Sequence, residues 1–192
     1  MALSVVEHIK GLLRSRGISQ SDLARDIFVS RQQLSYFLSG TRDLTLDLAL
    51  RLESYFELKE GSLLAMQAMT RMHRRKAEIR DGLVARLKAS AAFWSYQEVE
   101  GEDLSDEDVI ENTIVHLDME EIEALFFLYG WEKVKKVWKD RLACQGEHMQ
   151  DLNVMMAMYF FGIKKPEQYL RRLEYRYFKS LESYAQGTDG EY

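Results

Sequence analysis

Residues 18–45 read ISQSDLARDIFVSRQQLSYFLSGTRDLT. This stretch predicts two short helices with a turn between them, because each helix start carries its own capping pair. Ser19 with Asp22 marks the first start, and Ser30 with Gln33 marks the second. Thr45 can cap a third helix. The apolar residues of that helix are Leu46, Leu48, Ala49, Leu50 and Leu52.

The second of these helices, residues 30–38 with its cap, has two faces at a period of 3.6 residues. The side expected to be buried holds Leu34, Phe37 and Leu38, and the side expected to be exposed holds Arg31, Gln32, Ser35 and Tyr36. Arginine can pair with guanine and glutamine with adenine in the major groove of DNA. The first turn of a second helix is placed to reach base edges. The alternative is a solvated polar face on a small helical bundle.

A family resemblance favours the first interpretation. The matching pieces are Ser19-Gln20, Leu23-Ala24, Val29-Ser30, Leu34-Ser35, Leu38-Ser39-Gly40 and Thr41-Arg42, followed by the run from Leu44 to Leu52. On these residues, positions 5–67 resemble the lambda-repressor-like, Xre-type helix-turn-helix family. They look most similar to its HigA-like plasmid-maintenance antitoxin branch.

The resemblance implies a five-helix domain whose second helix binds bases. The base-reading residues it implies are Arg31, Gln32, Ser35 and Tyr36. The phosphate contacts it implies are Gln20, Ser30 and Arg42.

One position departs from the family pattern. The turn between the two helices usually carries glycine where this chain has Phe28. A non-glycine residue in a left-handed conformation costs on the order of 1 kcal/mol. Either the turn has a different conformation here, or Phe28 accepts that strain in order to bury its ring.

Composition and charge separate the chain into two halves. Among 192 residues, 46% are hydrophobic and only one is proline, which favours long helices and allows one or two domains. Residues 1–92 hold 15 Lys and Arg against 10 Asp and Glu, whereas residues 93–192 hold 11 against 21. The positive half suits phosphate binding, and the acidic half is repelled by DNA or is acidic for solubility alone.

The helical pattern continues to the end of the chain. A first helix is expected at about 4–16, a fifth at Gly61–Met69, and a helical stretch at 70–91 that includes the basic run from Arg71 to Lys76. That run either contacts the DNA backbone or is the solvated face of a connecting helix. We divide the all-helical chain into a helix-turn-helix domain (1–69), a helical linker (70–92), an acidic, aromatic-rich helical domain (93–186) and a frayed tail (187–192).

The second half has its own predicted helices. Residues 98–123 hold 12 acidic residues and no Lys or Arg, yet their apolar residues keep helical spacing. Ser105 with Asp108 and Asp118 with Glu121 are expected caps. Further helices are expected at Trp131–Ala143, at Met149–Phe161 and from Pro166 to about Tyr184, since proline suits a first helical turn.

The second half also resembles, more weakly, a small bacterial domain of uncharacterised function that occurs near toxin-antitoxin and abortive-infection genes. The similar pieces are Phe93-Trp94-Ser95-Tyr96, Asp108-Val109-Ile110-Glu111, Leu125-Phe126, Tyr129-Gly130, Val137-Trp138 and the run from Ala157 to Ile163. This likeness implies an antitoxin context and no particular chemistry.

Residue patterns of other functions do not emerge. The one cysteine, Cys144, is expected to be a small core residue, and none of the four histidines has a second His or Cys at metal-ligand spacing. The sequence contains no nucleotide-binding glycine loop, so we expect no enzyme, no cofactor and no metal. No apolar run is long enough to cross a membrane, and no signal peptide is recognised, so the expected location is the cytoplasm.

Residues 93–192 hold 17 of the 22 aromatic residues. They either fill a helical core or anchor a protein partner. The candidate anchors are Trp131, Tyr169, Tyr175 and Tyr177. We expect a homodimeric repressor on palindromic double-stranded DNA, whose second half dimerises the chain or holds a toxin. The alternative is a protein-interaction adaptor that keeps the helix-turn-helix fold without affinity for DNA.

Overall fold

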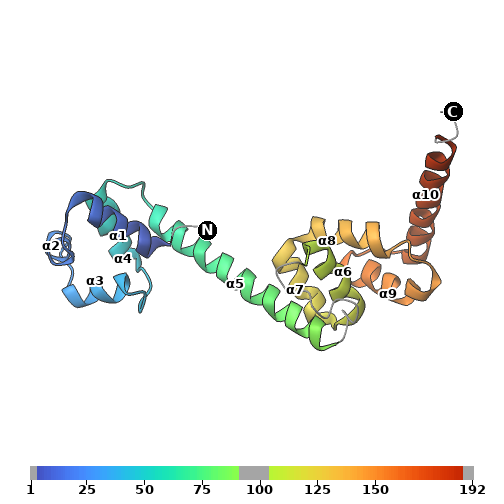
Figure 1. Cartoon of the computed structure of the whole chain (residues 1–192), viewed down its shortest axis with the longest axis horizontal. Coiled ribbons are helices and arrows are strands. Elements are labelled where there is room, and N and C mark those ends of the chain that lie inside the picture. Colours follow the sequence, from blue (N-terminus) through green and yellow to red (C-terminus); the bar gives the residue numbers. More distant parts are fainter. Residues whose placement is uncertain (1–3, 91–103, 188–192) are drawn as a thin grey trace. The chain divides into compact units, whose positions relative to one another are not determined.

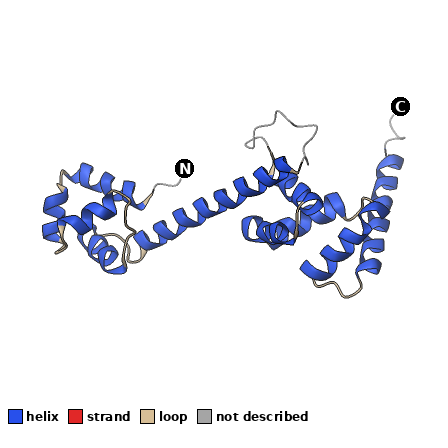
Figure 2. Ribbon diagram, turned by 90° about the horizontal axis from the view of Figure 1, so that it is seen from below, coloured by secondary structure: helices blue, strands red, loops and turns tan. Residues whose placement is uncertain are grey.

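A computed structural model describes residues 4–90 and 104–187, with side chains up to residue 179 in the last helix. Every regular element in these ranges is helical, which confirms the all-helical fold class (Figures 1 and 2). The Phe93-Trp94-Ser95-Tyr96 motif, residues 98–103 of the acidic segment and the predicted tail from 188 onward lie outside these ranges.

The described chain forms two compact units, Met1–Ala77 and Glu78–Tyr192. The first unit contains α1 (Val5–Arg16), α2 (Gln20–Asp26), α3 (Arg31–Leu38), α4 (Leu46–Phe56) and the beginning of α5 (Ser62–Ala89). The second unit contains the end of α5, then α6 (Asp106–His116), α7 (Met119–Tyr129), α8 (Trp131–Val137), the π-helix η1 (Trp138–Leu142), the 3-10 helix η2 (Glu147–Met149), α9 (Gln150–Met155), the π-helix η3 (Met156–Phe160) and α10 (Pro166–Gly187).

The predicted caps of the first unit are confirmed. The backbone N–H of Asp22 donates to Ser19 Oγ at 3.1 Å, and that of Gln33 donates to Ser30 Oγ at 3.1 Å. Thr45 Oγ1 accepts in the same way at the start of α4. Each bond satisfies a donor that a first helical turn leaves without a partner, so these side chains set where the three helices begin.

The turn between α2 and α3 contains a residue in the left-handed conformation. Phe28 has φ 55°, so the alternative of a different turn is wrong. The second alternative is correct about the strained backbone but wrong about its cause, because the Phe28 ring is 84% exposed rather than buried. Arg51 of α4 stabilises the turn, since its Nη1 donates a hydrogen bond to the carbonyl oxygen of Ile27 at 2.9 Å.

Because the Phe28 ring is exposed while its backbone is strained, we expect Phe28→Gly to raise the free energy of unfolding by up to about 1 kcal/mol. Glycine relieves the left-handed strain, and the larger entropy of the unfolded glycine chain offsets part of that gain. Phe28→Ala is the matched control: it removes the ring but keeps the strain, and should leave stability nearly unchanged. Chemical denaturation measures both. A loss of more than 1 kcal/mol in Phe28→Ala would show that the ring makes stabilising contacts.

The short fifth helix and the helical stretch expected after it form one continuous helix, α5. No glycine or proline interrupts its residues between Ser62 and Asp81, which explains the absence of a break. The last turns of α5 belong to the core of the second unit, where Leu83, Val84 and Leu87 are buried.

Each unit has its own hydrophobic core. In the first, Ile9, Leu23, Leu34 and Leu52 are fully buried. In the second, the indole of Trp138 is fully buried and its Nε1 donates to Asn153 Oδ1 at 2.8 Å.

In the second unit, the cap at Ser105 is confirmed, because the N–H of Asp108 donates to its hydroxyl at 3.1 Å. The other expected cap is only partly correct: Asp118 precedes α7, but its side chain makes no capping bond. Glu121, its expected partner, is buried and forms an ion pair with Arg86. Among the residues of both described ranges, no helix has the length and apolar character needed to cross a membrane.

Candidate nucleic-acid interface

The exposed face of α3 carries the polar residues that the sequence predicted for it. Leu34, Phe37 and Leu38 are buried, and they fix the rotation of the helix on the core. The opposite side presents Arg31, Gln32 and Ser35 as exposed residues and Tyr36 as a half-buried one. The two-faced helix predicted from the 3.6-residue period is therefore confirmed.

The side chains on this face contact one another. Gln32 Nε2 donates to Tyr36 Oη at 2.8 Å, across one turn of α3. The guanidinium of Arg42, in the loop after α3, lies 5.0 Å from the centroid of the Tyr36 ring, a cation–π distance. The backbone N–H of Arg42 also donates to the Tyr36 carbonyl at 3.0 Å. These contacts join α3 and the following loop into one polar surface.

The three candidate phosphate contacts are all exposed. Gln20 is the first residue of α2, and Ser30 precedes α3 as its cap. The Ser30 hydroxyl oxygen accepts from Gln33, which leaves the hydroxyl hydrogen to donate to an anion. Arg42 belongs to the loop after α3, but its guanidinium packs over the Tyr36 ring and so extends the exposed face of α3.

An acidic group lies close to these candidate phosphate contacts. Asp22 accepts a hydrogen bond from the Ser19 hydroxyl at 2.6 Å and pairs with Arg25 at 3.0 Å. The bond from Ser19 lowers the pKa of Asp22, and the positive charge of Arg25 acts in the same direction. The carboxylate therefore stays ionised, but Arg25 balances its charge near the start of α2.

Sequence reasoning missed the residue that holds the loop after α3. The side-chain amide of Gln67, on α5, makes two hydrogen bonds to the backbone of Leu44: it accepts from the N–H at 2.8 Å and donates to the carbonyl at 3.1 Å. Because 23 residues separate the partners, no local pattern signals this contact. The loop that carries Arg42 is thus fixed to the fifth helix at its far end.

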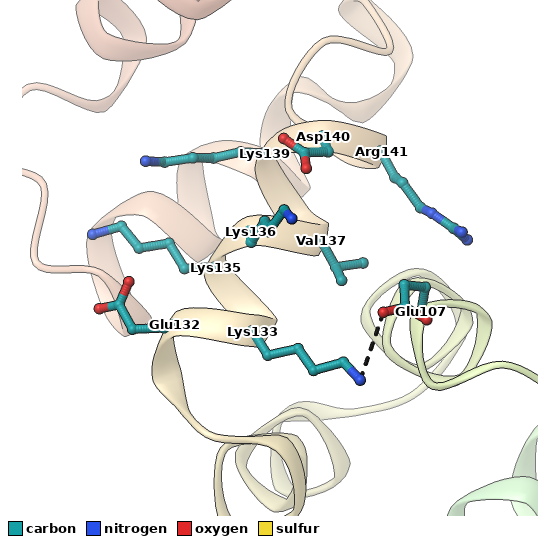
Figure 3. A pocket seen from close by; sticks show the side chains of 9 residues that line it. All are labelled: Glu107, Glu132, Lys133, Lys135, Lys136, Val137, Lys139, Asp140 and Arg141. Atoms are coloured by element: carbon teal, nitrogen blue, oxygen red, sulfur yellow. Dashed lines mark ion pairs between the residues drawn. The ribbon is translucent and has the colours of Figure 1, made fainter.

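A basic surface lies on α8 and η1 in the second unit, although this half of the sequence is acidic overall (Figure 3). It borders a cavity of about 690 Å³. Two of its cations are balanced by carboxylates of α6: Lys133 Nζ lies 2.6 Å from Asp106, and Arg141 Nη1 lies 2.7 Å from Asp108 and 2.9 Å from Glu111. These pairs join α6 to α8 and η1, so part of the predicted acidic face holds two helices together.

The candidate partner-binding aromatics differ in exposure. Trp131, Tyr175 and Tyr177 are exposed, but Tyr169 is half-buried with its ring stacked on Trp138. The sequence analysis missed four large apolar residues that are exposed in the same unit. These are Phe127, Met158, Tyr159 and Phe178. The first three each neighbour a buried aromatic or apolar residue along the chain, and the helical period alone does not separate the two.

Comparison with known proteins agrees with the geometry of the first unit. Residues 9–63 match the family model described as helix-turn-helix. This segment is a lambda-repressor-like, Xre-type helix-turn-helix domain, the DNA-binding module of transcriptional regulators. Neither the curated proteins nor the solved structures give a match. Any more particular function of the chain must therefore be inferred from its own residues.

Proposed function

We propose that the chain is a sequence-specific repressor that binds a palindromic operator as a homodimer, in the manner of HigA-like antitoxins. The observation that carries the proposal is the outward face of α3, where Arg31, Gln32 and Ser35 are exposed above a buried apolar side. A helix with polar groups on its first turn can enter the major groove, where these groups reach base edges.

Around this face, the candidate phosphate contacts Gln20, Ser30 and Arg42 are positioned by helix starts and a fixed loop. Phosphate contacts set the register of a protein on the duplex, and base contacts set its sequence preference. The positive charge balance of residues 1–92 favours approach to DNA. In this proposal, Arg31, Gln32, Ser35 and Tyr36 read the bases, and the acidic second half holds a second copy or a toxin.

The alternative function is a protein-interaction adaptor without affinity for DNA. The observation that favours it is the set of exposed aromatic residues in the second unit, since aromatic side chains dominate the energetics of protein interfaces. The two functions differ in whether the chain binds its own promoter region.

A footprinting experiment on the promoter region of the chain's own gene tests the proposal. We expect two protected half-sites with centres one helical turn, about 34 Å, apart. We also expect the logarithm of the binding constant to fall linearly with the logarithm of salt concentration, because phosphate contacts release counterions. A scrambled fragment of equal length is the control. Equal affinity for both fragments, or no binding to either, favours the adaptor.

A further inference from the structure

The second unit contains an apolar pocket that has no role in the proposed DNA binding by α3. Its lining residues are Glu123, Phe126, Phe127, Trp131, Tyr159 and Phe160, and its volume is about 280 Å³. Phe126 and Phe160 are buried and form the floor, with ring centroids 5.1 Å apart. The pocket lies just below the usual size of small-molecule sites, so it suits one inserted apolar side chain.

The rim of this pocket is aromatic and acidic. Phe127, Trp131 and Tyr159 are 75%, 56% and 64% exposed, which is unusual for side chains of this size grouped together. Glu123 lines the pocket, and Glu120 is exposed one turn earlier on α7. Within the described part of the chain, neither carboxylate has a cation within ion-pair distance. The rim therefore suits an occupant that is both apolar and positively charged.

The distal part of α10 has these two properties. Leu170 and Leu173, near the start of α10, pack on the core of the second unit. Tyr177 and Phe178 continue the same helical stripe, at four and eight residues' spacing, yet both are exposed. Tyr175 is also exposed, one turn before Phe178 and on the opposite side of the helix from Tyr177. The apolar stripe of α10 thus extends beyond the core that its first turns cover.

Cations lie on the side of α10 that carries Tyr175, away from Tyr177. The exposed basic residues of this part of α10 are Arg171, Arg172, Arg176 and Lys179. The distal part of α10 extends away from the other helices of its unit (Figures 1 and 2). Because α10 is one continuous helix from Pro166 to Gly187, its distal part cannot return to the pocket on α7 of the same chain. An occupant of that pocket that has the α10 sequence therefore comes from another copy.

We propose that the distal part of α10, residues 171–179, docks in the aromatic pocket of a second copy of this chain, and that the second copy does the same in return. Arg172 and Arg176 then face Glu120 and Glu123 of the other copy, and the ring of Tyr175, which lies on the same side of α10, enters the pocket. An exchange of identical contacts about a two-fold axis closes into a dimer. This inference rests on the proposed homodimer and identifies the surface that forms it.

The area available agrees with a stable dimer. Each exposed aromatic side chain has roughly 100 Å² left to bury, about half of what a fully buried one covers. The pocket rim contributes three such residues, and the side of α10 that carries Arg172 and Arg176 contributes Tyr175, with Phe178 one turn further on. Over both copies these side chains give roughly 1,000 Å², which reaches the lower limit for a biological interface.

Charge reversal on the full chain tests the exchange by sedimentation equilibrium. One variant is Glu120→Lys/Glu123→Lys, and the other is Arg172→Glu/Arg176→Glu. Each alone places like charges at both contacts, so its dimer should weaken on the order of a hundredfold. An equimolar mixture of the two variants restores opposite charges at both contacts. That mixture should therefore form a heterodimer about as stable as the wild-type dimer.

The matched control is Lys164→Glu/Lys165→Glu, which makes the same charge change at exposed positions just before α10. It should dimerise like the wild type, and circular dichroism should show equal helix content in all variants. The inference is overturned if the wild type is monomeric, if either charge-reversed variant still dimerises like the wild type, or if the mixture of the two variants stays monomeric.

The same variants separate this inference from the proposed function. If both are correct, charge reversal lowers affinity for a palindrome but leaves affinity for a single half-site unchanged. If only the inference fails, the reversed chains still dimerise and bind the palindrome. If only the proposed function fails, the wild type dimerises through α10 but shows no preference for any DNA fragment.

Discussion

The double substitution Arg31→Ala/Gln32→Ala should remove most of the operator preference of this protein. Each lost base contact is expected to cost about 1 to 3 kcal/mol, which is roughly 5- to 150-fold in affinity for each residue. The physical reason is that both side chains are exposed on the first turn of α3, which enters the major groove in the proposed complex. Fluorescence anisotropy with operator and scrambled duplexes measures the effect.

The two DNA fragments distinguish base contacts from charge. Affinity for the scrambled duplex should fall much less, because only one positive charge is removed. The matched control is Arg25→Ala, which removes an exposed arginine that lies on α2 and is paired with Asp22 and Asp26. It should leave the ratio of the two affinities unchanged. Equal losses on both fragments in the double variant would contradict base reading by α3.

The largest effect on stability is expected from Glu53→Ala. The Glu53 side chain is buried on α4, and its carboxylate accepts hydrogen bonds from the backbone N–H groups of Gly61 at 2.8 Å and Leu63 at 2.7 Å. It therefore caps α5 from a different helix. Alanine leaves these donors without a partner in a buried place, so the first unit should lose about 2 to 4 kcal/mol of its free energy of unfolding.

The measurement needs a probe of the first unit. All three tryptophans occur after residue 93 of the sequence, so tryptophan fluorescence does not report on it. Hydrogen exchange of the amides in α1 and α4 gives the local stability directly. Glu53→Gln is the matched control: it keeps one acceptor oxygen and should lose about half as much. A loss under 0.5 kcal/mol in Glu53→Ala would mean that water satisfies the donors.

Features that depend on neighbouring residues were predictable from the sequence. The caps at Ser19, Ser30 and Thr45 follow from residue types and spacings within one helical turn, and the structure confirms them. The rotation of α3 was also predictable, because the helical period assigns Leu34 and Phe37 to the core without reference to any other segment. The helix-turn-helix domain was recognised for the same reason.

Features that depend on distant residues were not predictable. Glu53 lies in the middle of a helix, and nothing nearby in the sequence indicates that its carboxylate caps the next one. The bond from Arg51 to the turn before α3 spans 24 residues. Phe28 shows a different limit: the family pattern located a strained position correctly, but the exposure of its ring depends on how α2, α3 and α4 pack.

The aromatic pocket of the second unit depends on packing in the same way. Phe126 is in its floor and Phe127 on its rim, although the two are neighbours with nearly the same side chain. The sequence analysis named Trp131 as a candidate partner anchor, and its side chain is exposed, but the periodic pattern did not identify the residues that surround it.

The hydrogen bond between Gln32 and Tyr36 has a consequence for how the proposed repressor recognises DNA. The bond uses one of the two N–H groups of the glutamine amide. Adenine recognition needs the other N–H and the amide oxygen, so the bond to Tyr36 can be kept while the base is bound. In the proposed repressor, Tyr36 therefore orients the Gln32 amide before it meets a base, and less side-chain freedom is lost on recognition.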